Sequence, residues 1–256
     1  HSDVQKFALR KMGDVATPAT IRTLVEEMGD ADYRKRDVAA GSLRKIPEAR
    51  SALIKELTAC TDASKAWSIA ELLPSFEGKW RQDTLAALWK RLQDAIGSEE
   101  RIQTAFLHVL KQADAEFAYA KLADQGAKLV KGKKYKEAVG FLAPLKDFPA
   151  FKPEHKFQLA LAQLKLHAHT VTTNRQHPAV ELLTDLYRGS TYPVFETLRK
   201  EKSLAPEDFF ALGFSFVERS GQERGLGIDL LEHIAEQFPR NKIGKSAKNK
   251  LKLVTA

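Results

Sequence analysis

Apolar residues recur with the period of an α-helix along almost the whole chain, and this pattern constrains the fold more than any other feature. Ile21, Leu24, Val25 and Met28 occupy positions i, i+3, i+4 and i+7, which lie on one face of a helix. The same spacing recurs in the segments 85–96, 102–109, 157–164 and 209–217. No segment shows a sustained alternation of apolar and polar residues. The sequence therefore predicts an all-α protein.

Glycine and proline divide these helices at short intervals. The breaks fall at Thr17-Pro18, Gly29-Asp30, Ile46-Pro47, Pro74 and Gly97-Ser98. Helices of about 11–17 residues joined by short connections favour antiparallel neighbours. A short amphipathic helix cannot bury its apolar stripe alone, but stacked pairs share one continuous core. We therefore expect a right-handed α-α superhelix, an α-solenoid of antiparallel helix pairs.

The first half of the chain resembles HEAT repeats. The segment from Asp32 to Ala40 opens one helix of a pair, and Leu43, Ile46 and Leu53 continue the apolar stripe across a turn marked by proline. A second pair in the same style runs from Ala66 to Ile96. The resemblance implies a domain of HEAT-like helical repeats over residues 1–114.

The second half resembles tetratricopeptide (TPR) repeats. Gly126 and Ala138 are twelve residues apart, the spacing at which that family brings its two helices close together, and Gly213 and Gly225 repeat it. Leu122 and Phe209 replace the family's usual opening residue, and Leu142 replaces its typical second-helix aromatic, so no peptide-binding groove is carried over. The resemblance implies TPR-like repeats over residues 115–256, ending in a capping helix.

Two lysine clusters are the candidate binding residues. The first lies in the first TPR-like hairpin and the second in the last predicted helix, whose segment from Arg240 to Lys252 has no acidic residue. Clustered cations favour polyanions, and the net charge of +8 points the same way. A solvated surface and a polar terminal cap are the competing interpretations. The candidates are Lys128, Lys131, Lys133, Lys134, Lys136, Lys242, Lys245 and Lys248.

Motifs for catalysis or metal binding are not found in the sequence. It has neither a phosphate-binding loop nor a nucleophile elbow. The seven histidines and one cysteine do not fall at ligand spacing, so we predict no metal and no cofactor. Cys60 ends an apolar run, which predicts a buried thiol.

Trp67 and Glu71 form one remote enzymatic alternative. They are i and i+4 on one helix, and HEAT-like alkylpurine DNA glycosylases use a tryptophan and a carboxylate in a cationic groove. The rest of that family's pattern is missing here. A packed tryptophan beside a solvated glutamate is the simpler expectation.

The sequence thus predicts a non-catalytic protein–protein interaction scaffold that binds a partner peptide or helix on its concave face. A nucleic-acid or polyanion-binding repeat module is the alternative, and a HEAT-like DNA glycosylase the remote one. No run of 18 or more apolar residues occurs, so no membrane span is predicted. The opening His1-Ser2 segment has no signal-peptide pattern, and both the cytoplasm and the bacterial periplasm remain open.

Overall fold

A computed structural model of the chain describes residues 2–97, 99–174, 176–189 and 191–255. These residues contain α-helices and three short 3-10 helices but no strand, and each helix packs against its neighbours in chain order. The prediction of an all-α, solenoid-like fold is confirmed. Contacts divide the chain into two compact units, residues 1–121 and 122–256, which meet inside helix α8 (Ala115–Lys131).

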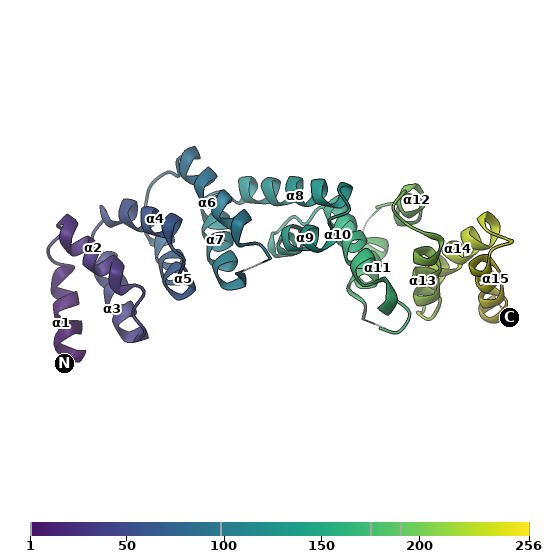
Figure 1. The fold of residues 1–256 in the computed structure, drawn as a ribbon, viewed down its shortest axis with the longest axis horizontal. Coiled ribbons are helices and arrows are strands. Elements are labelled where there is room, and N and C mark those ends of the chain that lie inside the picture. The colour runs from purple at the N-terminus through teal and green to yellow at the C-terminus, as the bar shows by residue number, and fades with distance from the viewer. Residues whose placement is uncertain (1, 98, 175, 190, 256) are drawn as a thin grey trace. The chain divides into compact units, whose positions relative to one another are not determined.

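The first unit is built from two rows of helices (Figure 1). Helices α1, α3, α5 and α7 follow one another in one row, and α2, α4 and α6 form the other. The bounds are α1 (Ser2–Met12), α2 (Pro18–Glu27), α3 (Tyr33–Leu43), α4 (Ala49–Ala59), α5 (Ala63–Leu72), η1 (Leu73–Ser75), α6 (Gln82–Ala95) and α7 (Glu100–Ala113).

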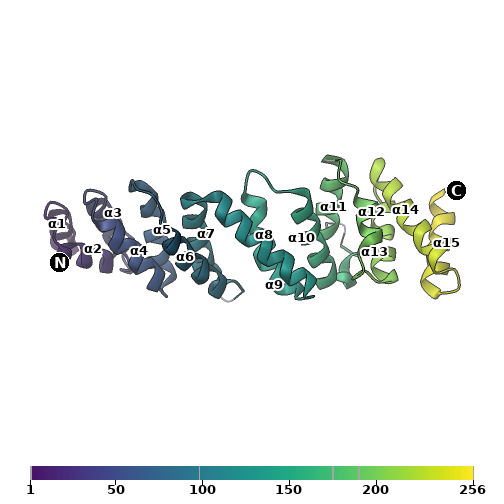
Figure 2. The same ribbon diagram turned by 90° about the horizontal axis from the view of Figure 1, so that it is seen from above.

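The second unit is held together mainly by contacts between successive helices, whereas in the first unit α1 also packs against α3 and α5 against α7. Neighbouring helices form the main contacts, with α13 against α14 and α14 against α15, as Figure 2 shows. The bounds are α9 (Tyr135–Leu142), η2 (Ala143–Asp147), α10 (Pro153–Leu166), η3 (Ala168–Thr170), α11 (Pro178–Gly189), α12 (Val194–Lys200), α13 (Pro206–Val217), α14 (Gln222–Gln237) and α15 (Lys242–Thr255).

Helix starts follow local sequence chemistry. Thr17 caps α2 by accepting a hydrogen bond from the Thr20 amide, and Pro18 occupies the first turn, where its missing N–H costs nothing. Asp32 caps α3 through the Arg34 amide, at 2.9 Å. Asp62 caps α5 through the Lys65 amide, at 2.7 Å. These caps fix where each helix of a pair begins.

The apolar stripes form the cores of both units. In the first unit Leu24, Leu53 and Phe106 are fully buried, and in the second Leu212 and Phe216 are. Burying a side chain of this size contributes about 1.5–3 kcal/mol relative to leaving it in water. The predicted periodicity therefore identified the faces that join the helices.

Glycines allow the closest approaches between helices of the second unit. A Cβ at Gly126 would lie 2.5 Å from Leu142 Cγ, so glycine is needed where α8 meets α9. A Cβ at Gly213 would come within 2.9 Å of Leu231 Cγ. The predicted role of Gly225 is wrong, because nothing lies within 4 Å of a Cβ placed there. The close approach of α14 to α13 lies instead at Gly227, half a turn further along α14.

Candidate functional site

The first predicted lysine cluster surrounds the turn between α8 and α9, and all of its side chains are exposed. Two of them are neutralised: Lys128 pairs with Asp124 at 2.7 Å and Lys134 with Glu137 at 3.7 Å. No ion pair is found for the other three in the described residues. These are Lys131, Lys133 and Lys136.

Lys133 occupies the left-handed region of backbone conformation, with φ of 59°. The Lys133 amide donates to the Val130 carbonyl (3.0 Å) and the Lys134 amide to the Leu129 carbonyl (2.9 Å), so the end of α8 is closed by a Schellman motif. Glycine usually holds this position, because a side chain there is strained. The chain thus carries a cationic side chain at the centre of this turn.

The second predicted cluster lies on α15. Lys242, Lys245 and Lys248 are exposed, and within the described part of the chain none of them forms an ion pair. Lys250 differs, because it pairs with Glu218 and its ammonium lies 4.2 Å from the centroid of the Phe214 ring. Lys250 therefore fastens α15 to α13, while the other three remain available.

The excess of positive charge belongs to the second unit. Residues 122–256 hold 22 Lys and Arg against 15 Asp and Glu, and residues 1–121 hold 19 against 18. Of the net charge of +8, the second unit therefore carries +7. A polyanion would be attracted to the second unit and hardly at all to the first.

A pocket of about 340 Å³ opens between α3, α5 and α7 of the first unit. At its centre Trp67 is 37% exposed, and its indole lies 5.5 Å from the His108 ring, centroid to centroid. Two arginines and several small side chains complete the wall. We call this the Trp67 pocket; its lining residues are Arg36, Ala63, Ser64, Trp67, Ser68, Arg101 and Thr104.

Both arginines of the Trp67 pocket lack an ion-pair partner among the residues that the structure describes. Arg36 is half-buried and donates from Nη1 to the carbonyls of Asp30 (2.7 Å) and Ala31 (3.3 Å). Carbonyl oxygens orient the guanidinium but do not cancel its charge. Asp30 itself is paired with Lys35 at 3.0 Å, and the pKa of its carboxyl is lowered by hydrogen bonds from the Asp32 amide and Lys35.

Trp67 packs against His108, but it lies outside the buried stripe of α5 and is more exposed than a packed tryptophan was expected to be. That stripe includes Ala66, Ile69 and Ala70, and Trp67 lies beside it, lining the pocket together with Ser64 and Ser68. Glu71 is exposed, as expected, but does not line the pocket. The arrangement needed for the glycosylase alternative, a carboxylate beside the tryptophan in one groove, is therefore not seen at the Trp67 pocket.

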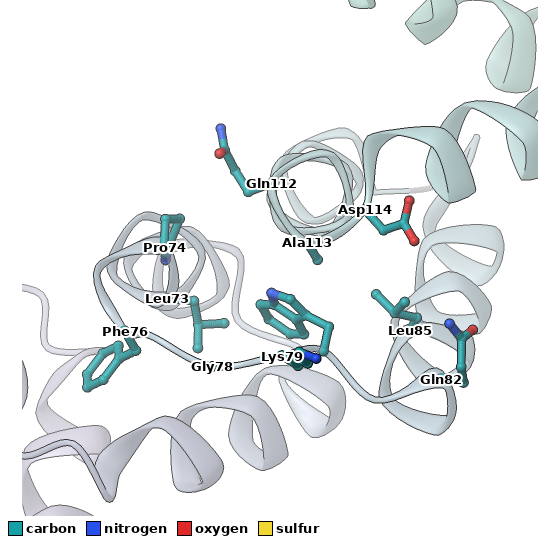
Figure 3. A pocket seen from close by; sticks show the side chains of 11 residues that line it. Leu73, Pro74, Phe76, Gly78, Lys79, Gln82, Leu85, Gln112, Ala113 and Asp114 are labelled. Atoms are coloured by element: carbon teal, nitrogen blue, oxygen red, sulfur yellow. The ribbon is translucent and has the colours of Figure 1, made fainter.

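A larger hollow, of about 540 Å³, lies beside the loop before α6 (Figure 3). Gln82, Gln112 and Asp114 surround it. Asp114 is engaged as the cap of α8, accepting from the Phe117 amide at 2.9 Å. Trp80 is covered by the Arg50 guanidinium, 4.7 Å from the ring centroid. Asp114 and Trp80 are therefore already engaged by groups of the protein itself.

A second hollow of about 540 Å³ lies in the second unit, between the segment after η3 and helix α13. Its arginine, Arg219, pairs with Glu181 and donates to Thr184 Oγ1 at 2.9 Å. Its carboxylate, Glu218, pairs with Lys250. The Trp67 pocket is smaller than these two hollows, but it combines a partly exposed indole with two arginines that form no ion pair within the described residues.

The cysteine and two of the histidines are also groups that can react or bind metals. Cys60 is buried, as predicted; burial raises the pKa of its thiol, and Sγ lies 3.2 Å from the Asp62 carbonyl oxygen. His167 directly follows α10, and His169 lies in the short 3-10 helix η3. Within the described residues no three His, Cys, Asp or Glu side chains are arranged to hold a metal ion.

In the same residues, no helix combines the length and apolar character needed to cross a bilayer.

Comparisons with protein-family models, with curated proteins and with solved structures found no match. The HEAT-like and TPR-like resemblances of the two halves therefore stay predictions, as does the domain division at residue 114. The Trp67 pocket was missed at the sequence level. Its one readable signal was a tryptophan placed off the apolar stripe of its helix.

Proposed function

We propose that this protein is a non-catalytic scaffold that binds a segment of a partner protein across α3, α5 and α7, with Trp67 as the anchor. The observation that carries the proposal is a partly exposed indole in a pocket lined by two arginines that form no ion pair within the described residues. Tryptophan and arginine are the residues most often found to dominate the binding energy of protein interfaces. A row of packed helices supports them rigidly, which keeps the entropic cost of binding low.

The lining of the Trp67 pocket favours binding over catalysis. It offers cations, an aromatic ring and hydroxyls, but no carboxylate that could act as a general base. Two of its hydroxyls are already donated to backbone carbonyls: Ser68 to Ser64 at 2.9 Å and Thr104 to Glu100 at 2.8 Å. They are therefore placed to accept hydrogen bonds from a ligand rather than to attack it.

Replacing Trp67 by alanine should weaken the binding of partner segments at least tenfold, because the anchor ring is lost. Short peptides are selected on the native protein from a random display library, and their affinities are measured by fluorescence polarisation. Phe7→Ala is the matched control, because Phe7 is also exposed, at 60%, but lies on α1 outside the pocket. Affinity for Phe7→Ala should change less than twofold. Selected peptides that bind Trp67→Ala as tightly as the native chain, or a selection that yields no peptide, would refute the proposal.

A second candidate function is polyanion binding by the second unit. It is favoured by the charge of +7 on residues 122–256 and by lysines at the α8–α9 turn and along α15 for which the described residues provide no ion pair. On this proposal the lysines contact phosphates, and counterion release drives the association. It uses a different unit from the Trp67 pocket, so the two functions are separable.

Nucleic-acid affinity should fall about a thousandfold between about 50 mM and about 200 mM salt if six lysines contact phosphates. The triple variant Lys242→Gln, Lys245→Gln, Lys248→Gln should reduce the slope of log affinity against log salt by about half. A triple Gln variant at Lys55, Lys79 and Lys90, which are exposed in the first unit, is the charge-matched control. Gel-shift titrations with duplex DNA and with RNA measure both. This function would be excluded if the gels showed no complex even at the lower salt. It would also be excluded if the two triple variants had equal slopes of log affinity against log salt.

A further inference from the structure

We propose that the Trp67 pocket recognises a carboxylate that lies next to a planar apolar group, as in a protein segment with an acidic residue beside an aromatic one. The inference rests on the proposed function and specifies the chemistry of its ligand. It is carried by the juxtaposition of three groups, Arg36, Trp67 and Arg101, on three neighbouring helices of one compact unit.

Arg36 supplies an oriented cation with unused donors. A guanidinium has five N–H groups, and the hydrogen bonds of Arg36 to Asp30 and Ala31 both leave from Nη1. The Nη2 and Nε groups are therefore free to meet the two oxygens of a carboxylate. Because Arg36 is half-buried, its charge is less screened by water than that of a surface lysine.

Trp67 supplies the surface for the planar group. His108 covers the ring only at a tilt of 53°, and 37% of the residue stays open to solvent. Stacking of an aromatic group on such a ring contributes about 0.5–1.5 kcal/mol beyond the area it buries. The small residues Ala63, Ser64 and Ser68 leave the space beside the indole, and about 340 Å³ suits one or two side chains rather than a large ligand.

Arg101 brings a second positive charge to the pocket from α7. Its side chain is exposed and has no carboxylate partner within the described residues. Two cations and no anion in the lining leave a positive potential at the pocket, which a negative group on a ligand would offset in part. An acidic segment would gain affinity from this, and a basic one would be rejected.

The overall charge of the first unit favours a carboxylate over the phosphate backbone of a nucleic acid. Residues 1–121 hold 19 Lys and Arg against 18 Asp and Glu, so they form no extended cationic field. Nucleic-acid binding depends on such a field, because its affinity comes from many phosphate contacts at once. A pocket with two local cations fits one anionic side chain.

Small probes test this inference without the partner. The chain has three tryptophans, so its amide correlation spectrum shows three indole N–H signals, and that of Trp67 is assigned by its loss in Trp67→Phe. Phenylacetate, which has a ring and a carboxylate, should shift this signal saturably and bind at least fivefold more tightly than benzyl alcohol or acetate. In Arg36→Gln/Arg101→Gln the advantage of phenylacetate over benzyl alcohol should vanish, while benzyl alcohol binds as before. Arg22→Gln/Arg44→Gln, at two exposed arginines outside the pocket, should behave as the native chain.

The outcomes separate this inference from the proposed function. Equal affinities for phenylacetate and benzyl alcohol, or a preference for phenyl phosphate of tenfold or more, would overturn the carboxylate inference. If selected peptides still required Trp67 in that case, the scaffold function would stand with an apolar ligand. If phenylacetate bound as expected and no peptide did, the pocket would keep its carboxylate chemistry and the scaffold function would fall.

Discussion

Replacing Gly227 by alanine should lower the free energy of unfolding of the second unit by about 2–3 kcal/mol. A Cβ at this position would lie 2.5 Å from the Val217 amide nitrogen and 2.8 Å from the Phe216 carbonyl carbon. Both are backbone atoms of α13, so neither can turn aside as the end of a side chain could. Relief requires α13 and α14 to move apart, and forcing extra volume into a packed interface costs about 1–3 kcal/mol.

Gly225→Ala is the matched control for this prediction. It adds the same methyl group to the same helix, but nothing lies within 4 Å of the new Cβ. Alanine is the better helix former by about 0.8–1.0 kcal/mol, so Gly225→Ala should stabilise the protein slightly. Urea denaturation followed by far-UV circular dichroism measures both variants. If both moved the midpoint in the same direction, the close packing of α13 on α14 at Gly227 would be wrong.

The opposite stability changes expected for Gly227→Ala and Gly225→Ala also test the register between α13 and α14. The TPR-like spacing of twelve residues from Gly213 places the close contact at Gly225, whereas the structure places it at Gly227. A residue count along one chain cannot detect this difference, because the rotation of α14 about its axis depends on what packs on its other sides. Leu226 and Leu230 of α14 are buried in the core of the second unit, and they fix that rotation.

The Trp67 pocket could not be predicted from the sequence for a related reason. Its cations come from α3 and α7, and Trp67 comes from α5; Arg36 and Arg101 are 65 positions apart in the chain. Periodicity predicts which face of each helix is buried, since that depends on local order. Which exposed faces meet depends on how successive pairs stack. The position of Trp67 beside the apolar stripe of Ala66, Ile69 and Ala70 was readable, but its neighbours were not.

The lysine candidates show where sequence reasoning is sufficient. A lysine off an apolar stripe is exposed whatever the stacking, so Lys131, Lys242 and Lys245 are exposed as expected. Lys250 is different because Phe214 and Glu218 of another helix lie against it. Local pattern therefore predicts exposure, and only tertiary contacts decide which cations remain unpaired.

His177→Ala should destabilise the second unit by about 2–4 kcal/mol at neutral pH, since it removes a buried cap and its hydrogen bonds. His177 is fully buried just before α11. Its Nδ1 accepts from the Ala179 amide at 3.2 Å, so the proton of the neutral ring is on Nε2, which lies 3.3 Å from the His167 carbonyl oxygen. A proton on Nδ1 would face the Ala179 N–H and break the cap.

The stability of the second unit should therefore fall as the pH drops below about 6.5. Burial lowers the pKa of His177 beneath its ordinary value of 6.5, although the hydrogen bond to the His167 carbonyl opposes this in part. Below that value the unfolded chain binds more protons than the folded one, so the contribution of the neutral ring is complete at higher pH and is lost on acidification. Burial also lowers the pKa of His155 and of His233, which adds in the same direction.

His177→Asn separates this contribution from the other two. Asparagine can still cap α11 through its side-chain oxygen but does not titrate. Its stability should be less reduced than that of His177→Ala at about pH 7.5, and it should lose less on going to about pH 5.5 than the native chain does. Urea denaturation at the two pH values measures the difference. An equal loss in the native chain and His177→Asn would mean that protonation of His177 is not the source of the acid sensitivity, which would then arise at other groups.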